Sequence, residues 1–529
     1  MKYVFYVLFF LTALSFSQNK TELKVTQSPL FKDKYYTNNT LITHATASGL
    51  TGVVRENKSA FSIDVVNKFM LDRKGLLIQK KQNEKYSGYL PCGNTIKLFT
   101  VVKTSKKGRE VYCYNIDVPS GRYFRSLLLN VKLNKNKSLF YNHSKTNSNF
   151  AISPNKDFFV VSTQDVKKDI KMQTVHVFNT KSFSLVYKQV FHNSEHLYKP
   201  NDLYIDNDAT VYALGKKYIY VFEESSNTLG KKNIVEGKEI GYGNRANYDI
   251  ELSKITAKKI EVKKANFNNK HLINRISITK KDNKMRLLGF YSNSYTESLK
   301  GLITFNVTKD NFNIGDEHLT EFPENELKSL VQKKPIISLK DKALKFNEFS
   351  DYFIDHIFYD DFGNIFLVAE QYKKVTLEKS VIHTTDFSRP GGFSSSYPTT
   401  TSVTKEFYNN LFVVKIDEKD NFIWGQAVFK RSKKPAYNAF YKEGKVHVVL
   451  NASSKLNTNK DSNTKIKTSA LKRSLYNIEF NADGKPSYKK IQDNFNKSSY
   501  KPFYGKFIGN RFINLSEKFN GSRRFLTLE

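Results

Sequence analysis

The first residues with the types and spacing of a chemical site are two histidines and a glutamate. His192-Asn193-Ser194-Glu195-His196 matches the H-x-x-E-H pattern of zinc proteases. In those enzymes a helix presents both histidines to the zinc, and the glutamate polarises a zinc-bound water. Here 185–191 reads as a strand and Pro200 follows at once, so no such helix is available. We therefore expect no metal centre, and we expect no other cofactor.

Three further short motifs have the letters of a functional site without its context. Gly241–Ala246 matches G-x-G-x-x-A, but neither a parallel strand nor a helix flanks it. Asp361-Phe362-Gly363 has the letters of the kinase metal triad but lies in a hairpin turn. Asp206-Asn207-Asp208 lacks the glycine and the distal glutamate of a calcium loop. No linear motif therefore predicts catalysis.

The elements that position any site in this chain are β-strands. Apolar residues alternate with period two, or run four to six long, between turn signals. A short strand, a polar turn and a longer strand recur at 150–161, 203–214 and 356–368, with further copies near Thr43, Ile276, Asn438 and Tyr504 and a weaker one at 89–102. A second strand pair with an Asp-, Asn- or Gly-rich turn recurs at 61–78, 112–128, 175–190, 413–424 and 476–488.

Together these halves make a repeating four-stranded unit about every 45 to 80 residues, which is typical of β-propeller blades. The sequence therefore predicts an all-β fold, a single β-propeller of eight blades, with seven as the alternative. The last unit lacks a fourth strand, and the strand near Leu23–Val25 has no blade of its own. We expect it to pair with Phe525–Leu528 and close the ring. Two stacked sandwiches would require a mid-chain linker, and none is evident.

The strand–turn–strand segment Val413–Trp424 resembles the repeat unit of secreted bacterial β-propeller proteins, many of which have no assigned function. The resemblance covers about the last third of the chain well and the remainder only by pattern. It implies the fold and export. Such repeats share no catalytic residues, so the resemblance implies no site.

Two stretches interrupt the repeats. Phe322–Lys334 carries Pro323 and then apolar residues at helical spacing, which predicts a short inserted helix. Ser380–Ser402 reads as a long loop inside the sixth blade. Long insertions on a rigid ring often hold binding residues, although a tolerated surface insertion would look the same.

A propeller usually binds its ligand at the mouth of the central channel, among the innermost strands. In the predicted register these strands carry His44, Asp355, His356, Tyr359, Tyr437, Tyr441 and Tyr504. Tyrosine offers a stacking face and a polar hydroxyl, which suits sugars and peptides. We predict His44, His356, Tyr359, Tyr441 and Tyr504 as ligand-binding residues, with packing between blades as the alternative role of each.

The predicted loop adds a second group of candidates. Its Gly391-Gly392 pair favours flexibility, whereas Phe387, Arg389, Phe393 and Tyr397 are unusual in a solvated spacer. An arginine can hold a carboxylate or sulfate through two hydrogen bonds while an aromatic ring stacks beside it. We predict that Arg389, Phe393 and Tyr397 contact ligand. The alternative is that the loop packs these rings on its own blade.

The N-terminus has the pattern of a secretory signal peptide. Lys2 precedes an apolar run from Val4 to Leu14, and Ser15 and Ser17 occupy the small-residue positions of a cleavage site. The apolar run is shorter than the roughly 20 residues of a membrane-spanning helix. Residues 1–17 are therefore the predicted signal peptide and 18–529 the propeller. We expect a secreted or periplasmic protein without a membrane span.

Cys92 and Cys113 would both meet an oxidising compartment after export. Pairing of 96–103 with 110–117 places Cys113 opposite about Thr100, and Cys92 some eight residues further along the strand. This arrangement puts the two residues about 26 Å apart, whereas bridged cysteines have Cα atoms within about 7 Å. We expect two separate thiols, and a different register would reopen the question.

The composition is strongly basic, with 85 Lys and Arg against 50 Asp and Glu and a formal charge of +35. Either an anionic partner or compositional drift explains this charge, and the even spread of the lysines favours drift. We expect weak, salt-sensitive attraction to anionic polysaccharide, no sequence-specific nucleic-acid binding, and a monomer. Another extracytoplasmic protein is the alternative partner.

Two functions are consistent with these observations. The first is an exported, non-catalytic binding or scaffold protein whose ligand is an acidic glycan or a peptide. The second is a polysaccharide-active hydrolase or lyase with its acid and base at the channel mouth. Two carboxylates within about 10 Å at that mouth would favour the enzyme. A mouth lined by Lys and Tyr alone would favour binding.

Overall fold

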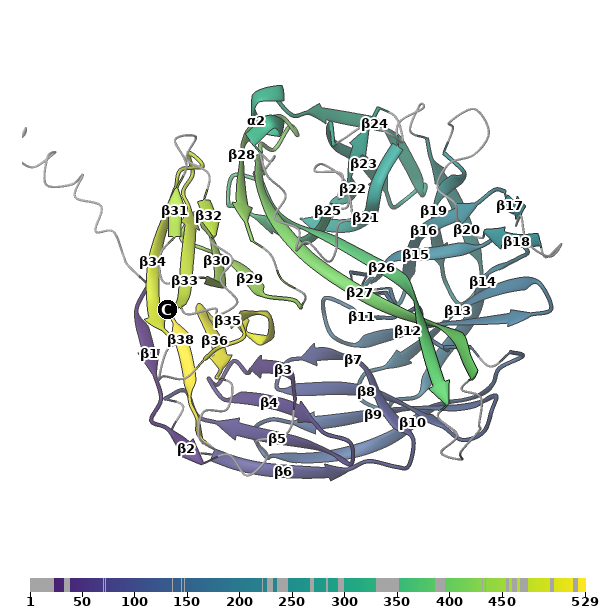
Figure 1. The fold of residues 1–529 in the computed structure, drawn as a ribbon, viewed down its shortest axis with the longest axis horizontal. Coiled ribbons are helices and arrows are strands. Elements are labelled where there is room, and N and C mark those ends of the chain that lie inside the picture. Colours follow the sequence, from purple (N-terminus) through teal and green to yellow (C-terminus); the bar gives the residue numbers. More distant parts are fainter. Residues whose placement is uncertain are drawn as a thin grey trace, which may run out of the picture.

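The chain forms a closed ring of four-stranded antiparallel sheets in this computed structural model (Figure 1). The structure describes residues 23–529 except 33–38, 70, 72, 136, 144, 147, 221, 226–231, 236–245, 267–270, 282–283, 294–298, 330–351, 386–394, 431, 433, 453–455, 459–463, 467–473, 495–498 and 517–521. Residues 1–22, including the predicted signal peptide, lie outside the described part.

The first four blades follow the chain order, each beginning at its innermost strand. Blade 1 contains β3 (Asn39–Ala45), β4 (Thr51–Glu56), β5 (Ala60–Val66) and β6 (Arg73–Gln79). Blade 2 contains β7 (Glu84–Cys92), β8 (Thr95–Lys103), β9 (Gly108–Asp117) and β10 (Arg122–Lys132). Blade 3 contains β11 (Phe150–Ile152), β12 (Phe158–Lys167), β13 (Ile170–Asn179) and β14 (Leu185–Ser194). Blade 4 contains β15 (Tyr198–Ile205), β16 (Val211–Tyr218), β19 (Tyr248–Ile255) and β20 (Ile260–Ala265), with the separate hairpin β17 (Phe222–Ser225) and β18 (Lys232–Val235).

The remaining blades complete the ring. Blade 5 contains β21 (His271–Lys281), β22 (Lys284–Ser292), β23 (Gly301–Thr308) and β24 (Asn313–Glu321). Blade 6 contains β25 (Tyr352–Tyr359), β26 (Ile365–Thr385), β27 (Ser395–Ile416) and β28 (Phe422–Phe429), extended by β32 (Thr464–Ile466) and β31 (Leu456–Thr458). Blade 7 contains β29 (Tyr437–Lys442), β30 (Lys445–Ala452), β33 (Ser474–Phe480) and β34 (Pro486–Asp493). Blade 8 contains β35 (Lys506–Ile508), β36 (Arg511–Leu515), β38 (Phe525–Leu528) and β1 (Val25–Gln27).

Eight blades and closure by both chain ends confirm the predicted fold. β1 pairs antiparallel with β38, Val25 opposite Leu528 and Gln27 opposite Leu526. The strands β2 (Phe31–Lys32) and β37 (Ser522–Arg523) add a second short pairing beside this blade. β38 is an interior strand because β36 pairs along its other edge. Because both chain ends contribute strands, blade 8 has four strands, as the sheets of blades 1 to 5 and 7 do, and this closes the ring.

Sequence chemistry explains why the strands reverse where they do. In the turn between β25 and β26, Asp360 accepts hydrogen bonds at Oδ1 from the backbone N–H of Phe362 (3.0 Å) and Asn364 (2.8 Å). Gly363 adopts a φ of +90°, a conformation that L side chains rarely tolerate. Asp361-Phe362-Gly363 therefore lies in a hairpin turn, as predicted, and Asp360 caps that turn.

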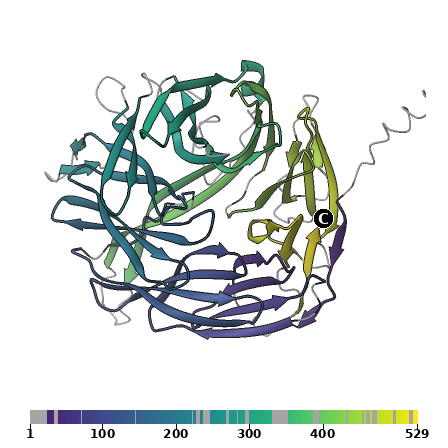
Figure 2. The same cartoon turned by 180° about the vertical axis from the view of Figure 1, so that it is seen from behind.

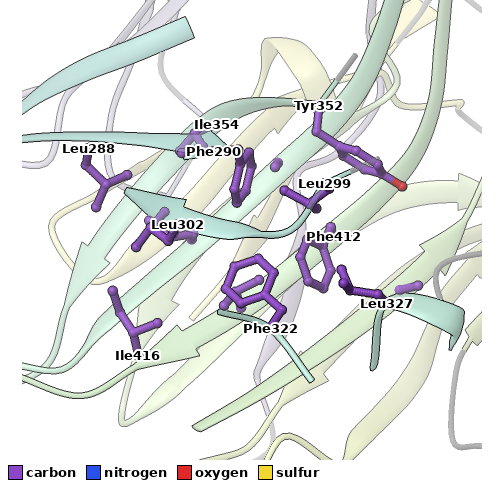
Figure 3. Close-up of a cluster of buried hydrophobic side chains, with 14 of the residues drawn as sticks. Leu288, Phe290, Leu299, Leu302, Phe322, Leu327, Tyr352, Ile354, Phe412 and Ile416 are labelled. Carbon is purple, nitrogen blue, oxygen red and sulfur yellow. The ribbon is translucent and has the colours of Figure 1, made fainter. Parts of the chain in front are cut away.

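The hydrophobic core lies between neighbouring blades. Figure 3 shows one such layer, where β22 and β23 of blade 5 face β26 and β27 of blade 6. Phe290, Leu302, Phe412 and Ile416 are each no more than 1% exposed. Because each blade is apolar on both faces, stability comes from the layers between blades around the whole ring.

The predicted inserted helix is present and the predicted long loop is largely wrong. α2 spans Glu324–Ser329, whereas 330–351 lie outside the described residues. Within the predicted loop at 380–402, β26 continues to Thr385 and β27 begins at Ser395. Ser380 pairs with Thr400 in this hairpin. Valine and threonine favour strands, whereas the glycines and serines of 391–396 are typical of a loop and concealed that preference.

The predicted position of Cys92 is also wrong. Cys113 lies opposite Phe99, one residue from the expected Thr100. The chain reverses at Gly93-Asn94, so Cys92 lies on the neighbouring strand β7, opposite Thr95. The distance of 26 Å along one strand therefore does not apply. Both thiols are nevertheless free, and Cys113 is buried.

We expect iodoacetamide to alkylate Cys92 and to leave Cys113 unmodified in the folded protein. Cys113 is fully buried, and burial raises the pKa of its thiol to about 12, so the reactive thiolate is scarce. Intact-mass measurement should show one added group under native conditions and two in denaturant. Two added groups in the native protein would show that Cys113 is accessible. No added group without prior reduction would show that the two cysteines are oxidised.

Candidate functional site

The two faces of the ring differ in the length of their connections. On one face, which we call the turn face, strands within each blade are joined by short turns, the longest being 67–72. The opposite face carries 133–149, 219–247, 322–351, 453–473 and the extended ends of β26 and β27. We call it the insertion face. Since loops on a rigid scaffold commonly carry binding residues, the insertion face is the candidate binding face.

The extended hairpin of β26 and β27 is the largest of these insertions. Beyond Glu370 the ladder shifts register and then continues from Tyr372–Tyr408 to Thr385–Ser395. In Figure 1 the hairpin passes diagonally in front of the ring toward β10 and β12, and in Figure 2, from behind, it passes behind the blades. It therefore lies over the insertion face across the mouth of the channel.

Residues 133–149, which join blades 2 and 3, form a second element at the mouth; we call them the strap. Leu133, Leu139 and Phe140 are buried in the core of blades 2 and 3. Further along, His143 lies 5.6 Å from Phe353 and 5.9 Å from Tyr372 between ring centroids. Blade 6 is opposite blade 2 in an eight-bladed ring, so the strap spans the channel.

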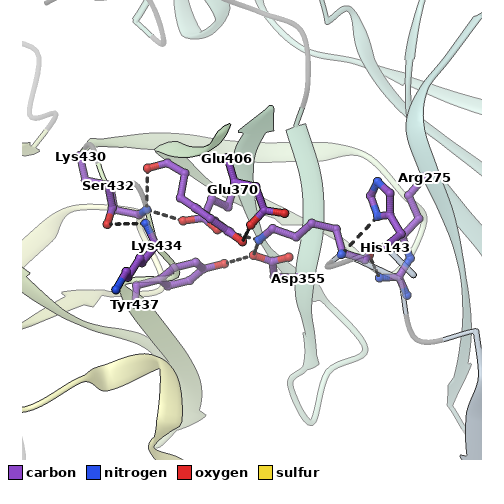
Figure 4. Close-up of polar contacts among 11 residues, drawn as sticks. His143, Arg275, Asp355, Glu370, Glu406, Lys430, Ser432, Lys434 and Tyr437 are labelled. Atoms are coloured by element: carbon purple, nitrogen blue, oxygen red, sulfur yellow. Dashed lines mark hydrogen bonds and ion pairs between the residues drawn. The ribbon is translucent and has the colours of Figure 1, made fainter. Parts of the chain in front are cut away.

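A cluster of buried charges forms where the strap meets blade 6 (Figure 4). The Nζ of Lys145 donates to Asp355 Oδ2 at 2.7 Å and to Glu370 Oε2 at 2.6 Å. Glu370 Oε1 also accepts from Lys430. The hydroxyl of Tyr437 donates to Asp355 Oδ2 at 2.7 Å. Blades 6 and 7 and the strap are thereby joined through one network.

Burial makes each charge in this cluster dependent on its partner. The Glu370 side chain is 1% exposed, and those of Lys145 and Lys430 are 8% and 5% exposed. Burial opposes the charged form of Lys145, but Asp355 and Glu370 more than compensate and raise its pKa. Burial lowers the pKa of Lys430 despite its contact with Glu370. It also raises the pKa of Tyr437, and the neighbouring Asp355 adds to that effect.

A β-bulge positions the aspartate of this cluster. The register of β25 and β26 shifts between Ile354 and His356, which leaves Asp355 without a partner in the ladder. A bulge turns its extra residue out of the usual alternation. Similar shifts occur in the innermost strands β3, β7, β15 and β21. Sequence alternation predicts the strands but not these bulges.

The structure brings three of the predicted channel residues together. Tyr437 contacts both Asp355 and His356, whose ring centroid is 5.7 Å from its own. Burial lowers the pKa of His356 to about 4, so this imidazole is neutral near pH 7. These residues therefore border the Lys145 cluster at the start of the innermost strands of blades 6 and 7.

The other predicted channel residues lie elsewhere. Tyr359 and Tyr441 are near the turn-face ends of β25 and β29, beneath Lys281 and against Phe366 respectively. His44 lies near the end of β3, and its Nε2 is 2.8 Å from the carbonyl of Gly93. Tyr504 is in η3 (Pro502–Tyr504), where its carbonyl accepts from Thr43 Oγ1 at 3.0 Å. These side chains do not converge with the Lys145 cluster.

The predicted loop residues cannot be placed in the same way. Arg389 and Phe393 lie outside the described residues, and Tyr397 is described only by its pairing with His383 in the hairpin. Their predicted role in ligand contact stays a prediction.

Sequence reasoning missed Lys145, Glu370 and Lys430. Glu370 follows the apolar run 365–369, and a carboxylate at the end of a buried strand is a signal that it has a partner. Nothing comparable marks Lys145, one of many scattered lysines. Its two partners are 210 and 225 residues away in sequence.

The H-x-x-E-H segment does not lie on a helix. His192 lies on strand β14, and its Nε2 is 3.0 Å from the carbonyl of His196. Across the described residues, no three His, Cys, Asp or Glu side chains are placed to share a metal ion. In the same part of the chain, no helix has the length and hydrophobicity needed to cross a membrane.

Comparisons with known proteins return solved structures at low sequence identity. No protein-family model and no curated protein matches the chain. The Dos1 propeller has 9% identity over 95% of this chain and 95% of its own, with a TM-score of 0.42. The β-propeller domain of the Trilobed protease from Pyrococcus furiosus has 11% identity over 86% and 98%, with a TM-score of 0.34. The chain spans about half, 55%, of a prolyl endopeptidase that it matches at 9% identity over 92% of this chain, with a TM-score of 0.39.

Proposed function

We propose that this protein is a non-catalytic binding or scaffold protein that recognises its ligand with the insertion face. The observation that carries the proposal is the segregation of the long connections between strands to that face. There the hairpin of β26 and β27 crosses the ring (Figure 1), and the strap contacts blade 6. Recognition surfaces are commonly built from loops that a rigid scaffold positions.

One observation favours the alternative, a polysaccharide-active hydrolase or lyase. Asp355 and Glu370 bind the same ammonium, so their nearest oxygens are no more than about 5 Å apart, close to the spacing of a retaining glycosidase pair. However, both oxygens of Glu370 are occupied by lysines and its side chain is 1% exposed. A carboxylate in this state is poorly placed to reach a glycosidic oxygen, which is why binding is the first proposal.

We further propose that the protein acts outside the cytoplasm, after cleavage near Ser17. The support is the signal-peptide pattern of residues 1–17. Its partner is then an extracytoplasmic polymer, either an acidic polysaccharide or a protein. The formal charge of +35 supports salt-sensitive attraction to anionic polymers without base-specific recognition.

A glycan and peptide array probed with residues 18–529, with and without EDTA, tests the binding proposal. We expect selective signals that EDTA leaves unchanged and no cleavage of the bound ligand by mass spectrometry. Cleavage products would instead establish the hydrolase or lyase. Uniform weak signals that disappear at physiological salt would mean that only nonspecific charge attraction is present.

Shortening the hairpin of β26 and β27, which we call the crossing hairpin, tests the insertion face more specifically. Replacing 376–404 by Asn-Gly closes it as a two-residue turn at the paired residues Val375 and Lys405. We expect ligand binding to weaken roughly tenfold or more while thermal stability stays close to wild type, because these residues pair mainly with each other.

The matched control replaces the hairpin 222–235 by a short Gly/Ser turn. This hairpin belongs to the insertion face but lies at the periphery of the ring, away from the channel mouth that the crossing hairpin covers. It should leave both binding and stability unchanged. Intact binding after removal of the crossing hairpin, together with a lower Tm, would show that the hairpin only caps its own blade.

A further inference from the structure

We propose that Asp355, Glu370, Tyr408 and Tyr437 form a binding site for the primary ammonium of a ligand, and that Lys145 occupies it in the unliganded protein. We call these four residues the ammonium cage. This inference rests on the proposed binding function, because it names the ligand chemistry recognised at the channel mouth: a peptide or protein presenting a lysine side chain.

The geometry of the cage matches the requirements of an ammonium group. Lys145 Nζ has two carboxylate acceptors, at 2.7 Å and 2.6 Å, which come from the paired strands β25 and β26 of blade 6. The same nitrogen lies 5.5 Å from the centroid of the Tyr408 ring, within cation–π range. A carboxylate pair with an aromatic face is how proteins commonly hold amines.

The charge of the cage requires a cationic occupant. Asp355 and Glu370 contribute two negative charges, and Lys430, which binds Glu370 from the other side, contributes one positive charge. The walls therefore carry one net negative charge in a buried site. Because an uncompensated buried charge is strongly unfavourable, a single monocation completes the site.

The cage walls are held in place without Lys145. The Tyr437 hydroxyl fixes Asp355 at 2.7 Å, and Lys430 holds Glu370, which projects from the paired strand β26. Such a site is preorganised, so a ligand ammonium would not need to order it.

Lys145 enters the cage from a different part of the ring. Its main chain is held by Arg275 of blade 5, which donates to the Lys145 carbonyl at 2.7 Å. The described residues of 141–149 belong to neither helix nor strand. The backbone N–H of Lys145 also donates to His143 Nδ1 at 3.3 Å. Neither backbone hydrogen bond belongs to a strand ladder, so among the described residues Lys145 can leave the cage without disrupting a sheet.

An internal lysine competes with any ligand at a high effective concentration. A free amine therefore cannot displace it, whereas a ligand that also contacts the hairpin and the strap can. This requirement favours a lysine within a larger peptide over a small amine.

Chemical rescue tests the cage independently of any natural ligand. Lys145→Ala removes the equivalent of n-propylammonium, so we expect this ion to raise the Tm of the variant in a saturable way. 1-Propanol and tetramethylammonium, which lack the charge or the N–H donors, should not. Lys97→Ala is the matched control, because buried Lys97 binds Asn115 Oδ1 and the Thr180 carbonyl rather than a carboxylate. Equal rescue of both variants, or none of Lys145→Ala, would overturn the cage.

Peptide binding tests displacement. We expect Lys145→Ala to bind lysine-bearing array peptides roughly tenfold more tightly than wild type, since the internal competitor is gone, and to lose that gain when the lysine is acetylated. If the variant is too unstable, hydrogen exchange in wild type should instead show faster exchange in 141–149 on addition of the lysine peptide. Selective glycan binding without any lysine dependence would refute the ammonium inference and leave the binding function intact; absence of all selective binding would refute the function.

Discussion

Deletion of residues 524–529 is expected to abolish the cooperative unfolding transition of the ring. The deletion removes β38, the interior strand of blade 8, so β1 loses its only partner strand in that sheet and β36 keeps only β35. Phe525, Leu526 and Leu528 are each no more than 1% exposed. Loss of such side chains costs roughly 2–5 kcal/mol each, which together approaches the whole stability of a typical domain, about 5–15 kcal/mol.

Differential scanning calorimetry of the truncated chain checks this result. As a control, a chain that begins at Ser28 removes β1, an outer strand whose Val25 is 37% exposed. We expect the Tm of this chain to fall by less than that of the chain lacking 524–529. A truncated protein that melts at the wild-type temperature would show that the chain ends do not close the ring.

The second large effect is a steep loss of stability as the pH falls from 7 to 5. Burial lowers the pKa of His143, His176, His356 and His447 to about 4 in the folded protein. The ordinary value of about 6.5 applies to the unfolded chain. The unfolded state therefore binds more protons throughout this window, and stability decreases as the pH falls from 6.5 toward 4. For four such groups the loss between pH 7 and pH 5 is roughly 5–7 kcal/mol.

Denaturant titrations at half-unit pH intervals measure this effect, because the slope of unfolding free energy against pH gives the number of protons taken up. We expect about four protons near pH 5 from these histidines, and His44 and His192, whose pKa values burial also lowers, add to that number. His447→Asn, at a residue that stacks on Phe440 within the ring, should reduce that number by one whatever its effect on stability. A flat profile between pH 7 and pH 5 would mean that these histidines are charged in the folded protein.

The repeating strands could be predicted because their signals are local. Val413–Trp424 alternates on both sides of an Asp-rich turn, and it forms β27 and β28 with the turn at 417–421. Even the weak copy at 89–102 forms β7 and β8. The hairpin beyond Glu370 escaped prediction because its strands are rich in hydroxyl residues and pair outside the blade.

The candidate site could be predicted only where it coincides with the innermost strands. Asp355, His356 and Tyr437 follow from the position of β25 and β29 in their blades. Lys145 does not, since its position depends on where the strap crosses the ring and on partners more than two hundred residues away. The neutral balance of the Lys145 cluster is likewise a property of tertiary contacts that no local pattern encodes.

Hydrogen-exchange footprinting of the strongest array ligand on wild-type protein tests the central claim most directly. Binding should slow exchange in α2, along β26 and β27 beyond Glu370, and in the strap except at 141–149, where displacement of Lys145 speeds exchange. Exchange in the turns at 206–210, 360–364 and 417–421 should stay unchanged. Protection confined to those turns, with the insertion face unaffected, would contradict the assignment of the insertion face as the ligand-binding surface.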